Sequence, residues 1–216
     1  MTRKERAYLI AKKMEEMYPD ARCSLQYEEP LQLLIAVILS AQCTDARVNM
    51  VTPALFERFP ALDDFCEASQ EEIADYIRSC GFYNSKSKNI LAMCKMLKED
   101  FGGVVPDNIE DLTKLPGVGR KTANLICGDV YGKPSYVVDT HMIRISQRMG
   151  IAKVDEKESN PAEKIEMQLR KVLPAEGSGD FCHRIVLHGR ALCSARKAKC
   201  DECALNDICM KRIKKK

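Results

Sequence analysis

The sequence predicts an all-α fold. Apolar residues recur at helical spacing along most of the chain, and N-cap residues precede several of these stretches. No stretch alternates apolar and polar residues in the way that a half-buried strand does. With 216 residues, of which 45% are hydrophobic, the chain suits one large or two small domains with genuine cores.

The first helices are predicted from apolar periodicity and capping residues. Residues 5–18 carry apolar positions at helical spacing, and residues 30–39 are apolar on every side, as expected of a fully buried helix. Ser69 and Glu72 form a capping box that opens a further helix, and Gly81 ends it.

The later helices are predicted mainly from their ends. Asn160, Pro161 and Glu163 supply an N-cap, an N1 proline and an N3 acid in the expected order. The helices expected in this part of the chain are residues 85–101, 108–114, from about 120, 140–149 and from about 161.

The chain carries none of the sequence features of an exported or membrane protein. Its most apolar run, "LQLLIAVIL", is much shorter than the roughly 20 residues that a membrane span needs, and its N-terminus is charged throughout. An odd count of eleven cysteines without an export signal favours reduced thiols, some of them reserved for a metal centre. We therefore expect a cytoplasmic protein with no membrane partner, associated with the nucleoid if its source is prokaryotic.

Positive charge is concentrated at the C-terminal end. Residues 183–216 contain ten Lys and Arg against three Asp and Glu, whereas the remaining residues contain 24 against 28. Such a basic patch is typical of proteins that bind nucleic acid, because neutralising phosphates releases counterions. The last six residues, "KRIKKK", are more simply a solubilising tail. The patch therefore depends on cations within apparently folded sequence: Arg184, Arg190, Arg196, Lys197 and Lys199.

The segment "LPGVGRKTA" predicts a hairpin between two helices. Asn108 caps the first helix, and the second begins near Arg120. Gly117 and Gly119 free the backbone to adopt positive φ and to expose consecutive N–H groups beside a helix N-terminus, which is a cradle for phosphate. Gly-x-Gly alone would favour an ordinary tight connection between packed helices. The neighbouring cations favour phosphate binding, without reading of base sequence.

Lys121 occupies an unusual place for a lysine. In the first turn of a helix, the dipole and the adjacent Arg120 both disfavour the charged ammonium form. A neutral amine there can attack an electrophilic carbon and form a Schiff base. A phosphate-binding lysine is the simpler alternative.

Asp139, in "VVDTHMIRI", is the candidate carboxylate that would work with Lys121. It directly precedes a helical pattern that ends at Gly150, so it is also an obvious N-cap. An ionised carboxylate of fixed orientation can stabilise a cationic sugar-like transition state or move protons. The two roles are compatible.

Four cysteines form a second constellation near the C-terminus. They are spaced C-x6-C-x2-C-x5-C: Cys193, Cys200, Cys203 and Cys209. Four thiolates suit a [4Fe-4S] cluster, and the spacing alone leaves structural zinc open as an alternative. The other seven cysteines are scattered and are expected to be small core residues or surface thiols.

The ordered set of motifs resembles the endonuclease III family of helix-hairpin-helix DNA glycosylases and abasic-site lyases, from about residue 5 to 210. The motifs are "ILSAQCTD", "GFYNSKSKNI", "LPGVGRKTAN", "VVDTHMIR", "LHGRALCSARKAKC" and the four-cysteine spacing. The resemblance implies that Lys121 is the Schiff-base lysine and Asp139 the catalytic aspartate. It also implies that the four cysteines bind a [4Fe-4S] cluster.

The resemblance further implies two helical domains with a DNA cleft between them. Residues 23–133 would form a six-helix barrel with the helix-hairpin-helix motif, and residues 1–22 with 134–216 a discontinuous cluster domain. The damaged nucleotide must leave the duplex to be reached. Gln42 would fill the gap, and Phe82 would wedge the opposite strand. The expected DNA-binding residues are Gln42, Phe82, Gly117, Val118, Gly119, Arg120 and Lys121.

Two positions depart from the family pattern. Phe82 stands where leucine is common, which keeps an apolar wedge, and Cys43 stands where the family has a small residue, so that oxidation could affect the site. Asp45 is a possible pocket residue, or simply an acid at a helix N-terminus. His141 is a possible pocket residue whose packing or phosphate-contact role is favoured over that of a general base.

The function that the resemblance implies is base excision repair. The chain would remove oxidised pyrimidines from duplex DNA, form a Schiff base through Lys121 and cleave 3′ to the abasic site by β-elimination. Its partner would be double-stranded DNA with damaged pyrimidines or abasic sites, and it would act as a monomer. A monofunctional adenine or mismatch glycosylase and a non-catalytic DNA-binding protein are the alternatives.

Overall fold

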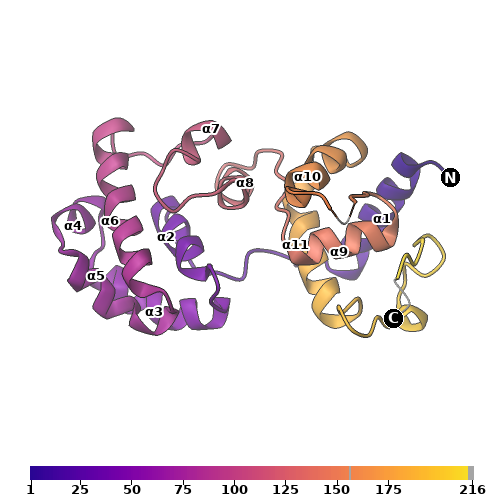
Figure 1. The fold of residues 1–216 in the computed structure, drawn as a ribbon, viewed down its shortest axis with the longest axis horizontal. Coiled ribbons are helices and arrows are strands. Elements are labelled where there is room, and N and C mark those ends of the chain that lie inside the picture. The colour runs from indigo at the N-terminus through magenta and orange to yellow at the C-terminus, as the bar shows by residue number, and fades with distance from the viewer. Residues whose placement is uncertain (156, 214–216) are drawn as a thin grey trace. The chain divides into compact units, whose positions relative to one another are not determined.

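A computed structural model describes residues 1–155 and 157–213 (Figure 1). The terminal lysines of the expected solubilising tail, residues 214–216, lie outside the described residues. The described chain is helical without strands, and an isolated bridge joins Cys193 and Ala198. Its α-helices are α1 (Arg3–Met17), α2 (Pro30–Ser40), α3 (Asp45–Arg58), α4 (Leu62–Glu67), α5 (Gln70–Ile77), α6 (Tyr83–Asp100), α7 (Ile109–Leu112), α8 (Arg120–Asp129), α9 (Thr140–Met149), α10 (Pro161–Val172) and α11 (Ser178–Ala191). Two 3₁₀ turns, η1 (Arg78–Cys80) and η2 (Cys200–Glu202), complete them.

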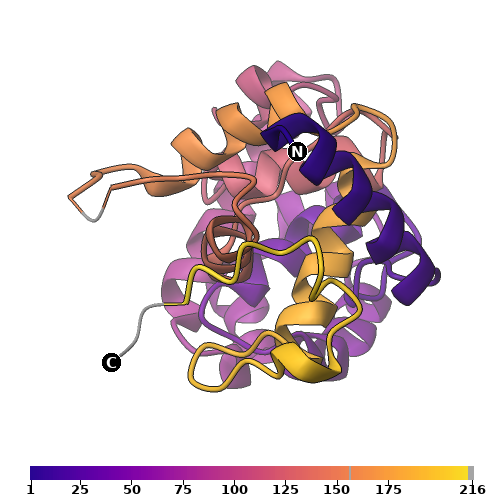
Figure 2. The ribbon, with the colours of Figure 1, turned by 90° about the vertical axis from the view of Figure 1, so that its right-hand side faces the viewer.

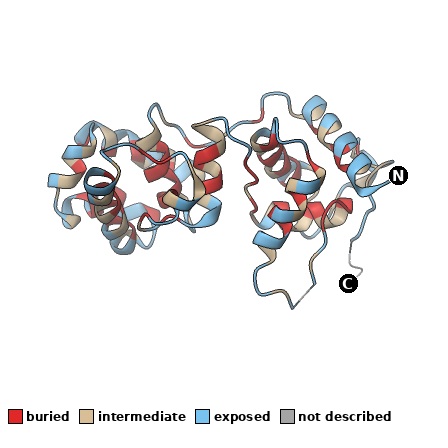
Figure 3. Ribbon diagram, turned by 90° about the horizontal axis from the view of Figure 1, so that it is seen from above, coloured by how far each residue is buried: buried red, intermediate tan, exposed pale blue. Residues whose placement is uncertain are grey.

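The chain divides into two compact units. One is residues 23–131, and the other joins residues 1–22 to residues 132–216. The boundaries expected from the sequence were 23–133 for the first unit and 1–22 with 134–216 for the second. Each unit has its own hydrophobic core (Figure 3).

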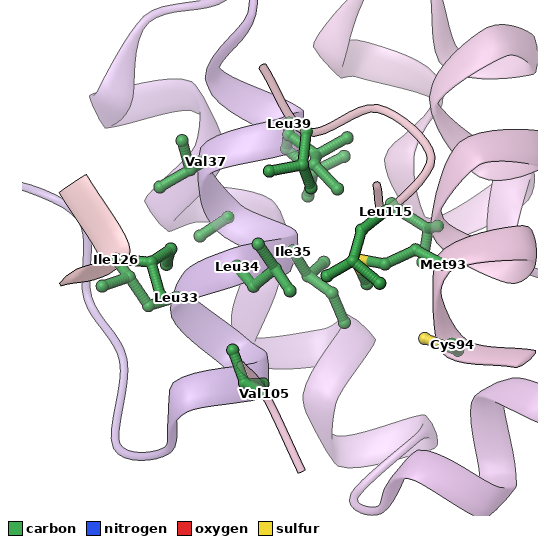
Figure 4. Packing of buried hydrophobic residues seen from close by; sticks show 14 of the residues in the cluster. Leu33, Leu34, Ile35, Val37, Leu39, Met93, Cys94, Val105, Leu115 and Ile126 are labelled. Atoms are coloured by element: carbon green, nitrogen blue, oxygen red, sulfur yellow. The ribbon is translucent and has the colours of Figure 1, made fainter. Parts of the chain in front are cut away.

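The core of unit 23–131 is built around α2. Seven consecutive residues of this helix, Leu33–Leu39, are buried, and α2 packs against α3, α6 and α8. Figure 4 shows its side chains among Met93 of α6, Leu115 of the hairpin and Ile126 of α8. The prediction of a helix that is apolar on every side is therefore confirmed. Burial of Leu115 and Ile126 in the same core holds the hairpin and α8 to the body of the unit.

The second unit is discontinuous in sequence. Helix α1 packs against α10 and α11, and α9 packs against the same two helices. Figure 2 shows the indigo N-terminal helix alongside the later helices. The N-terminal helix thus covers a core to which residues 136–205 supply the other side chains.

The predicted caps are present. Ser69 and Glu72 form the capping box of α5, and the side chains of Asn108 and Asn160 accept hydrogen bonds at the starts of α7 and α10. Two boundaries differ from the prediction. The helix expected to run to Cys80 ends as a 3₁₀ turn, and α6 begins at Tyr83 rather than at residue 85.

None of the described helices is long and apolar enough to cross a membrane.

Candidate functional site

The hairpin between α7 and α8 has the predicted form. Asn108 Oδ1 accepts a 2.9 Å hydrogen bond from the Asp111 N–H, and α8 begins at Arg120. The first N–H groups of α8 have no acceptor within the helix, because helical pairing starts only with Ala123, whose N–H donates to the Gly119 carbonyl at 2.9 Å. The exposed start of α8 therefore has N–H groups that make no helical hydrogen bond, as at helix starts that bind anions.

The two hairpin glycines do different things. Gly117 has φ of +80°, and a Cβ there would lie 3.0 Å from the Asn89 Cβ. Gly119 has φ of −96° and is the extended N-cap of α8, so the expectation that both glycines need positive φ is wrong for Gly119. A Cβ at Gly119 would meet no protein atom within 4 Å. The space in front of Gly119 is open, and this allows a ligand to approach its backbone closely.

Val118 does not fit its expected role as a DNA contact. Its side chain is buried in the core, and its N–H donates to the Leu115 carbonyl at 3.1 Å. The side chain and the N–H of Val118 are therefore both used within the protein. The buried side chain anchors the hairpin to the core. Gly117, Gly119 and Arg120 are exposed, as expected.

Lys121 is the second residue of α8 and is exposed. The first turn of α8 contains no acidic residue, so the two cations at this helix start stand against the positive end of the dipole. An exposed amine directly after the hairpin is placed to reach a sugar whose phosphates the hairpin holds.

Asp139 is the N-cap of α9. Its Oδ1 accepts a 2.7 Å hydrogen bond from the Met142 N–H, and the residue is half-buried. This bond occupies one carboxylate oxygen and fixes the orientation of the other. Asp139 belongs to the unit of residues 132–216, whereas Lys121 belongs to the unit of residues 23–131.

Gln42 and Phe82 lie in two loops of unit 23–131. Both residues are exposed and both have left-handed backbone conformations, with φ of 53° and 49°. Such a conformation is unusual for residues other than glycine and occurs often at functional sites. The Phe82 side chain is 67% exposed, which leaves an aromatic ring unburied at the start of α6.

Lys86 is a residue that sequence reasoning missed. It is only 5% exposed, and its Nζ donates 2.8 Å hydrogen bonds to the carbonyls of Leu39 and Cys80. One ammonium group thus ties the end of α2 to η1 and supports the loops of Gln42 and Phe82. Burial lowers the pKa of Lys86. Helical spacing from the buried Ile90 could have indicated that this lysine faces inward.

The two possible pocket residues are held by neighbours. Asp45 begins α3 and accepts a 2.6 Å hydrogen bond from Ser24 Oγ. His141 Nδ1 lies 3.2 Å from an Arg144 nitrogen, and a Cβ on Gly189 would come within 2.2 Å of the same Nδ1. Burial, with Arg144 and Arg190, lowers the pKa of His141. Its close packing against α11 supports a structural role.

The four cysteines of the C-terminal constellation line one pocket. Met149, His188 and Leu205 also line it, so the pocket is largely apolar. The Cys203 Sγ lies 3.8 Å from His188 Nε2, and Arg148 Nη1 donates to the Cys193 Sγ at 3.4 Å. Arg148 also donates to the carbonyls of Ser194 and Ala195 at 2.7 and 2.9 Å, and this holds the first ligand loop in place.

The donor set of this pocket can be compared with two kinds of metal centre. A zinc ion binds four thiolates at about 2.3 Å, whereas a cubane cluster holds four thiolates on separate irons. Among residues 1–155 and 157–213, no three His, Cys, Asp or Glu side chains are grouped closely enough to bind a single metal ion. The four thiols of this largely apolar pocket match the ligand set of a [4Fe-4S] cluster.

The basic patch near the C-terminus is partly structural. Arg184 is 8% exposed, and its Nε donates to the Tyr18 carbonyl at 3.3 Å. It therefore cannot contact DNA, and its inclusion in the nucleic-acid patch was wrong because α11 turns it inward toward α1. Arg196, Lys197 and Lys199 are exposed on the cysteine loop.

Comparison with known proteins places these features in a family. A family model described as HhH-GPD superfamily base excision DNA repair protein matches residues 35–175. The chain is 46% identical over 209 residues to endonuclease III of Synechocystis sp., covering 96% of this chain and 93% of that protein. It is 40% identical over 200 residues to endonuclease III of Escherichia coli, covering 93% and 92%.

Solved structures agree. A trapped endonuclease III–DNA covalent intermediate has a TM-score of 0.88 and 40% identity, covering 98% of this chain and 97% of that one. A thermostable thymine-DNA glycosylase has a TM-score of 0.82 at 22% identity over 95% of both chains, which shows the shared fold alone. The hairpin, the cap residues and these near-full-length matches together assign the chain to the endonuclease III family of HhH-GPD base excision DNA repair enzymes.

Proposed function

We propose that Lys121 and Asp139 carry out the reaction of this bifunctional DNA glycosylase and abasic-site lyase, with oxidised pyrimidines in duplex DNA as its substrates. The observation that carries the proposal is the exposed Lys121 in the first turn of α8, directly after the hairpin. A related endonuclease III has been trapped in a covalent complex with DNA, and a covalent bond to DNA requires a nucleophile of this kind.

The Lys121 amine, once it has lost its proton, attacks C1′ of the extruded nucleotide. The bond between C1′ and the damaged base breaks, the base leaves with a proton, and the opened sugar remains joined to Lys121 as an imine. The imine acidifies the C2′ hydrogens, and loss of one of them expels the 3′ phosphate by β-elimination. The strand is thereby cleaved on the 3′ side of the abasic sugar.

Asp139 stabilises positive charge on the sugar as the base departs. Its carboxylate is held by the Met142 N–H, so its orientation is set before the substrate binds. The same group moves protons between the amine and the sugar. The hydrogen bond that makes Asp139 an N-cap also holds its carboxylate in one orientation.

The hairpin and two loops bind the duplex. Phosphate lies against Gly117, Gly119 and the first amides of α8, while Gln42 fills the space left by the extruded nucleotide. Phe82 separates bases on the opposite strand with its exposed ring. The chain acts on this substrate as a monomer, since one copy supplies all of these groups.

The pocket of Cys193, Cys200, Cys203 and Cys209 holds a [4Fe-4S] cluster. The common pocket of the four thiols and its apolar walls support this assignment. Bound there, the cluster supplies structural order and one-electron redox capacity rather than hydrolysis. Arg148 and His188 contact the ligand sulfurs and orient them.

A strand-cleavage assay tests the proposal. A duplex with one thymine glycol should yield both the free base and a strand cut 3′ to the abasic sugar. Base release without a cut would instead indicate a monofunctional glycosylase, and binding without either product would indicate a non-catalytic DNA-binding protein.

A further inference from the structure

Two cysteine thiols meet beneath the loops that carry Gln42 and Phe82. Cys43 lies between α2 and α3, and Cys80 is the last residue of η1. The two thiols lie close enough to interact, since the Cys43 thiol contributes to raising the pKa of Cys80 after burial, the main cause. Cys43 is half-buried, whereas Cys80 is only 1% exposed. Cys43 is therefore the more accessible residue of the pair.

Lys86 keeps the two thiols together. Its Nζ bonds to the carbonyls of Leu39 and Cys80 fix the two chain segments from which the thiols project. The charged groups that face Cys80 are Lys86 and Arg47, and both favour its thiolate. Burial outweighs them and raises the pKa of Cys80 to about 11. Cys80 is thus a protonated thiol at neutral pH. It gives up its proton only as its sulfur attacks an oxidised Cys43.

We propose that Cys43 and Cys80 form a reversible redox pair, whose disulfide joins the two DNA-binding loops and weakens binding of damaged DNA. The oxidant is a peroxide. The Cys43 thiolate attacks one peroxide oxygen and becomes a sulfenic acid, while the second oxygen leaves as water or alcohol. The Cys80 sulfur then attacks the Cys43 sulfur, and the sulfenic hydroxyl departs with the Cys80 proton as water. A dithiol reverses the reaction.

The disulfide acts on backbone that already has unusual conformations. Cys43 directly follows Gln42, and Cys80 is separated from Phe82 by Gly81, with φ of 53° at Gln42, 65° at Gly81 and 49° at Phe82. A bond between the sulfurs would fix the separation of the two loops, so that neither could adjust independently when a duplex binds. The effect on DNA rests on the proposed roles of Gln42 and Phe82, but formation of the disulfide does not.

Cys66 and Cys94 provide a matched control in the same unit. Burial and the nearby Cys66 thiol raise the pKa of Cys94, which is buried while Cys66 is half-buried. Cys66 lies beside Lys98 and Asp63, away from the loops of Gln42 and Phe82. Removing the Cys66 thiol should therefore leave the proposed redox response intact.

The experiment treats the full-length, cluster-loaded protein with hydrogen peroxide, blocks free thiols and digests it with trypsin. Cleavage after Arg and Lys places Cys43 in peptide 23–47 and Cys80 in peptide 79–86. Mass spectrometry should find these peptides joined in the wild type and in Cys66→Ala, and separate in Cys43→Ala and Cys80→Ala. Because peptide 23–47 also contains Cys23, the Cys43→Ala variant identifies the partner. Visible absorbance verifies that the cluster survives.

Binding is measured on a duplex with an uncleavable abasic-site analogue. Oxidation should weaken wild-type binding about tenfold, comparable to losing one aromatic stacking contact, and a dithiol should restore it. Cys43→Ala and Cys80→Ala should bind normally before and after peroxide. Separate peptides in oxidised wild type, or joined peptides with unchanged binding, would overturn the proposal. Failure of the reduced wild type to bind would instead refute the proposed function.

Discussion

Asp139 Oδ1 accepts a 2.7 Å hydrogen bond from the backbone N–H of Met142. The carboxylate proposed to stabilise the transition state therefore also begins α9. A catalytic group that is bonded into its own helix start needs no reorganisation when charge develops on the substrate. The two roles use different properties of the side chain, namely its charge and its hydrogen-bond acceptor, and substitution separates them.

Asp139→Asn should keep the cap and lose the charge. Its free energy of unfolding should remain close to wild type, whereas Asp139→Ala should lose about 1 kcal/mol because the Met142 N–H is left without its acceptor. Both variants should excise the base on the order of 10²-fold more slowly or worse. Urea titration and single-turnover kinetics measure the two effects. Normal excision by Asp139→Asn would show that the carboxylate is only a cap.

The hairpin glycines should respond differently to alanine. Gly117→Ala should destabilise the protein by about 1–2 kcal/mol, because φ is positive there and Asn89 is close. Gly119→Ala should leave stability unchanged, since its Cβ meets no protein atom, but weaken binding to all DNA sequences alike.

Salt titration separates this effect from loss of a charge. Affinity should fall steeply with salt, and neutralising Arg120 should lessen the slope by about one unit, while Gly119→Ala should keep the slope. Equal DNA affinity of wild type and Gly119→Ala would contradict close approach of the backbone to phosphate.

The purified protein should be yellow-brown and contain about four irons per chain. Cys200→Ser should lower the yield of folded protein, because binding of a metal centre adds to the free energy of folding of the segment that holds it. Cys66→Ser, which removes a thiol far along the chain from the ligands, should keep the full iron content. Iron analysis and visible absorbance measure both, and a colourless protein with one zinc would refute the cluster.

His141 should make stability depend on pH. Burial holds its pKa below the ordinary 6.5, so the unfolded chain binds a proton more readily than the folded protein. The free energy of unfolding should therefore fall as the pH drops through this value. The free energy of unfolding of His141→Asn should fall less than that of the wild type between about pH 7.5 and about pH 5.5. The two free energies of unfolding are measured by urea titration at each pH. An equal change with pH in both proteins would contradict this account.

The sequence predicted those features that depend on short-range contacts. The capping bonds of Ser69 and Asn108 each span three residues, so both partners are visible in one stretch of sequence. Helix α2 was predictable because burial on every side requires an unbroken apolar run. Helices α3 and α11 were not predicted because they lack these sequence signals. Helix α3 contains Pro53 in its interior, and α11 follows Gly177 without a capping side chain.

Contacts between distant segments could not be predicted in the same way. Val118 is buried in a core to which distant helices, α2 and α6 among them, contribute, and the hairpin motif alone did not indicate this burial. The Lys86 ammonium donates a hydrogen bond to a carbonyl 47 residues away in the sequence. The Arg184 guanidinium donates one to a carbonyl 166 residues away. Long polar side chains of this kind look like surface cations until the fold supplies their partners.

Borohydride trapping on a thymine glycol duplex tests the central claim, the assignment of Lys121 as the nucleophile. Reduction converts the imine into a stable amine, so the wild type should become covalently linked to the DNA and also cut it. Lys121→Gln keeps a polar side chain of similar length without the amine, and it should bind the duplex but show neither cross-link nor cut. Lys114→Gln, which removes an exposed lysine on the other side of the hairpin, should behave as the wild type. A cross-link to Lys121→Gln would contradict the account, because another amine would then be the nucleophile.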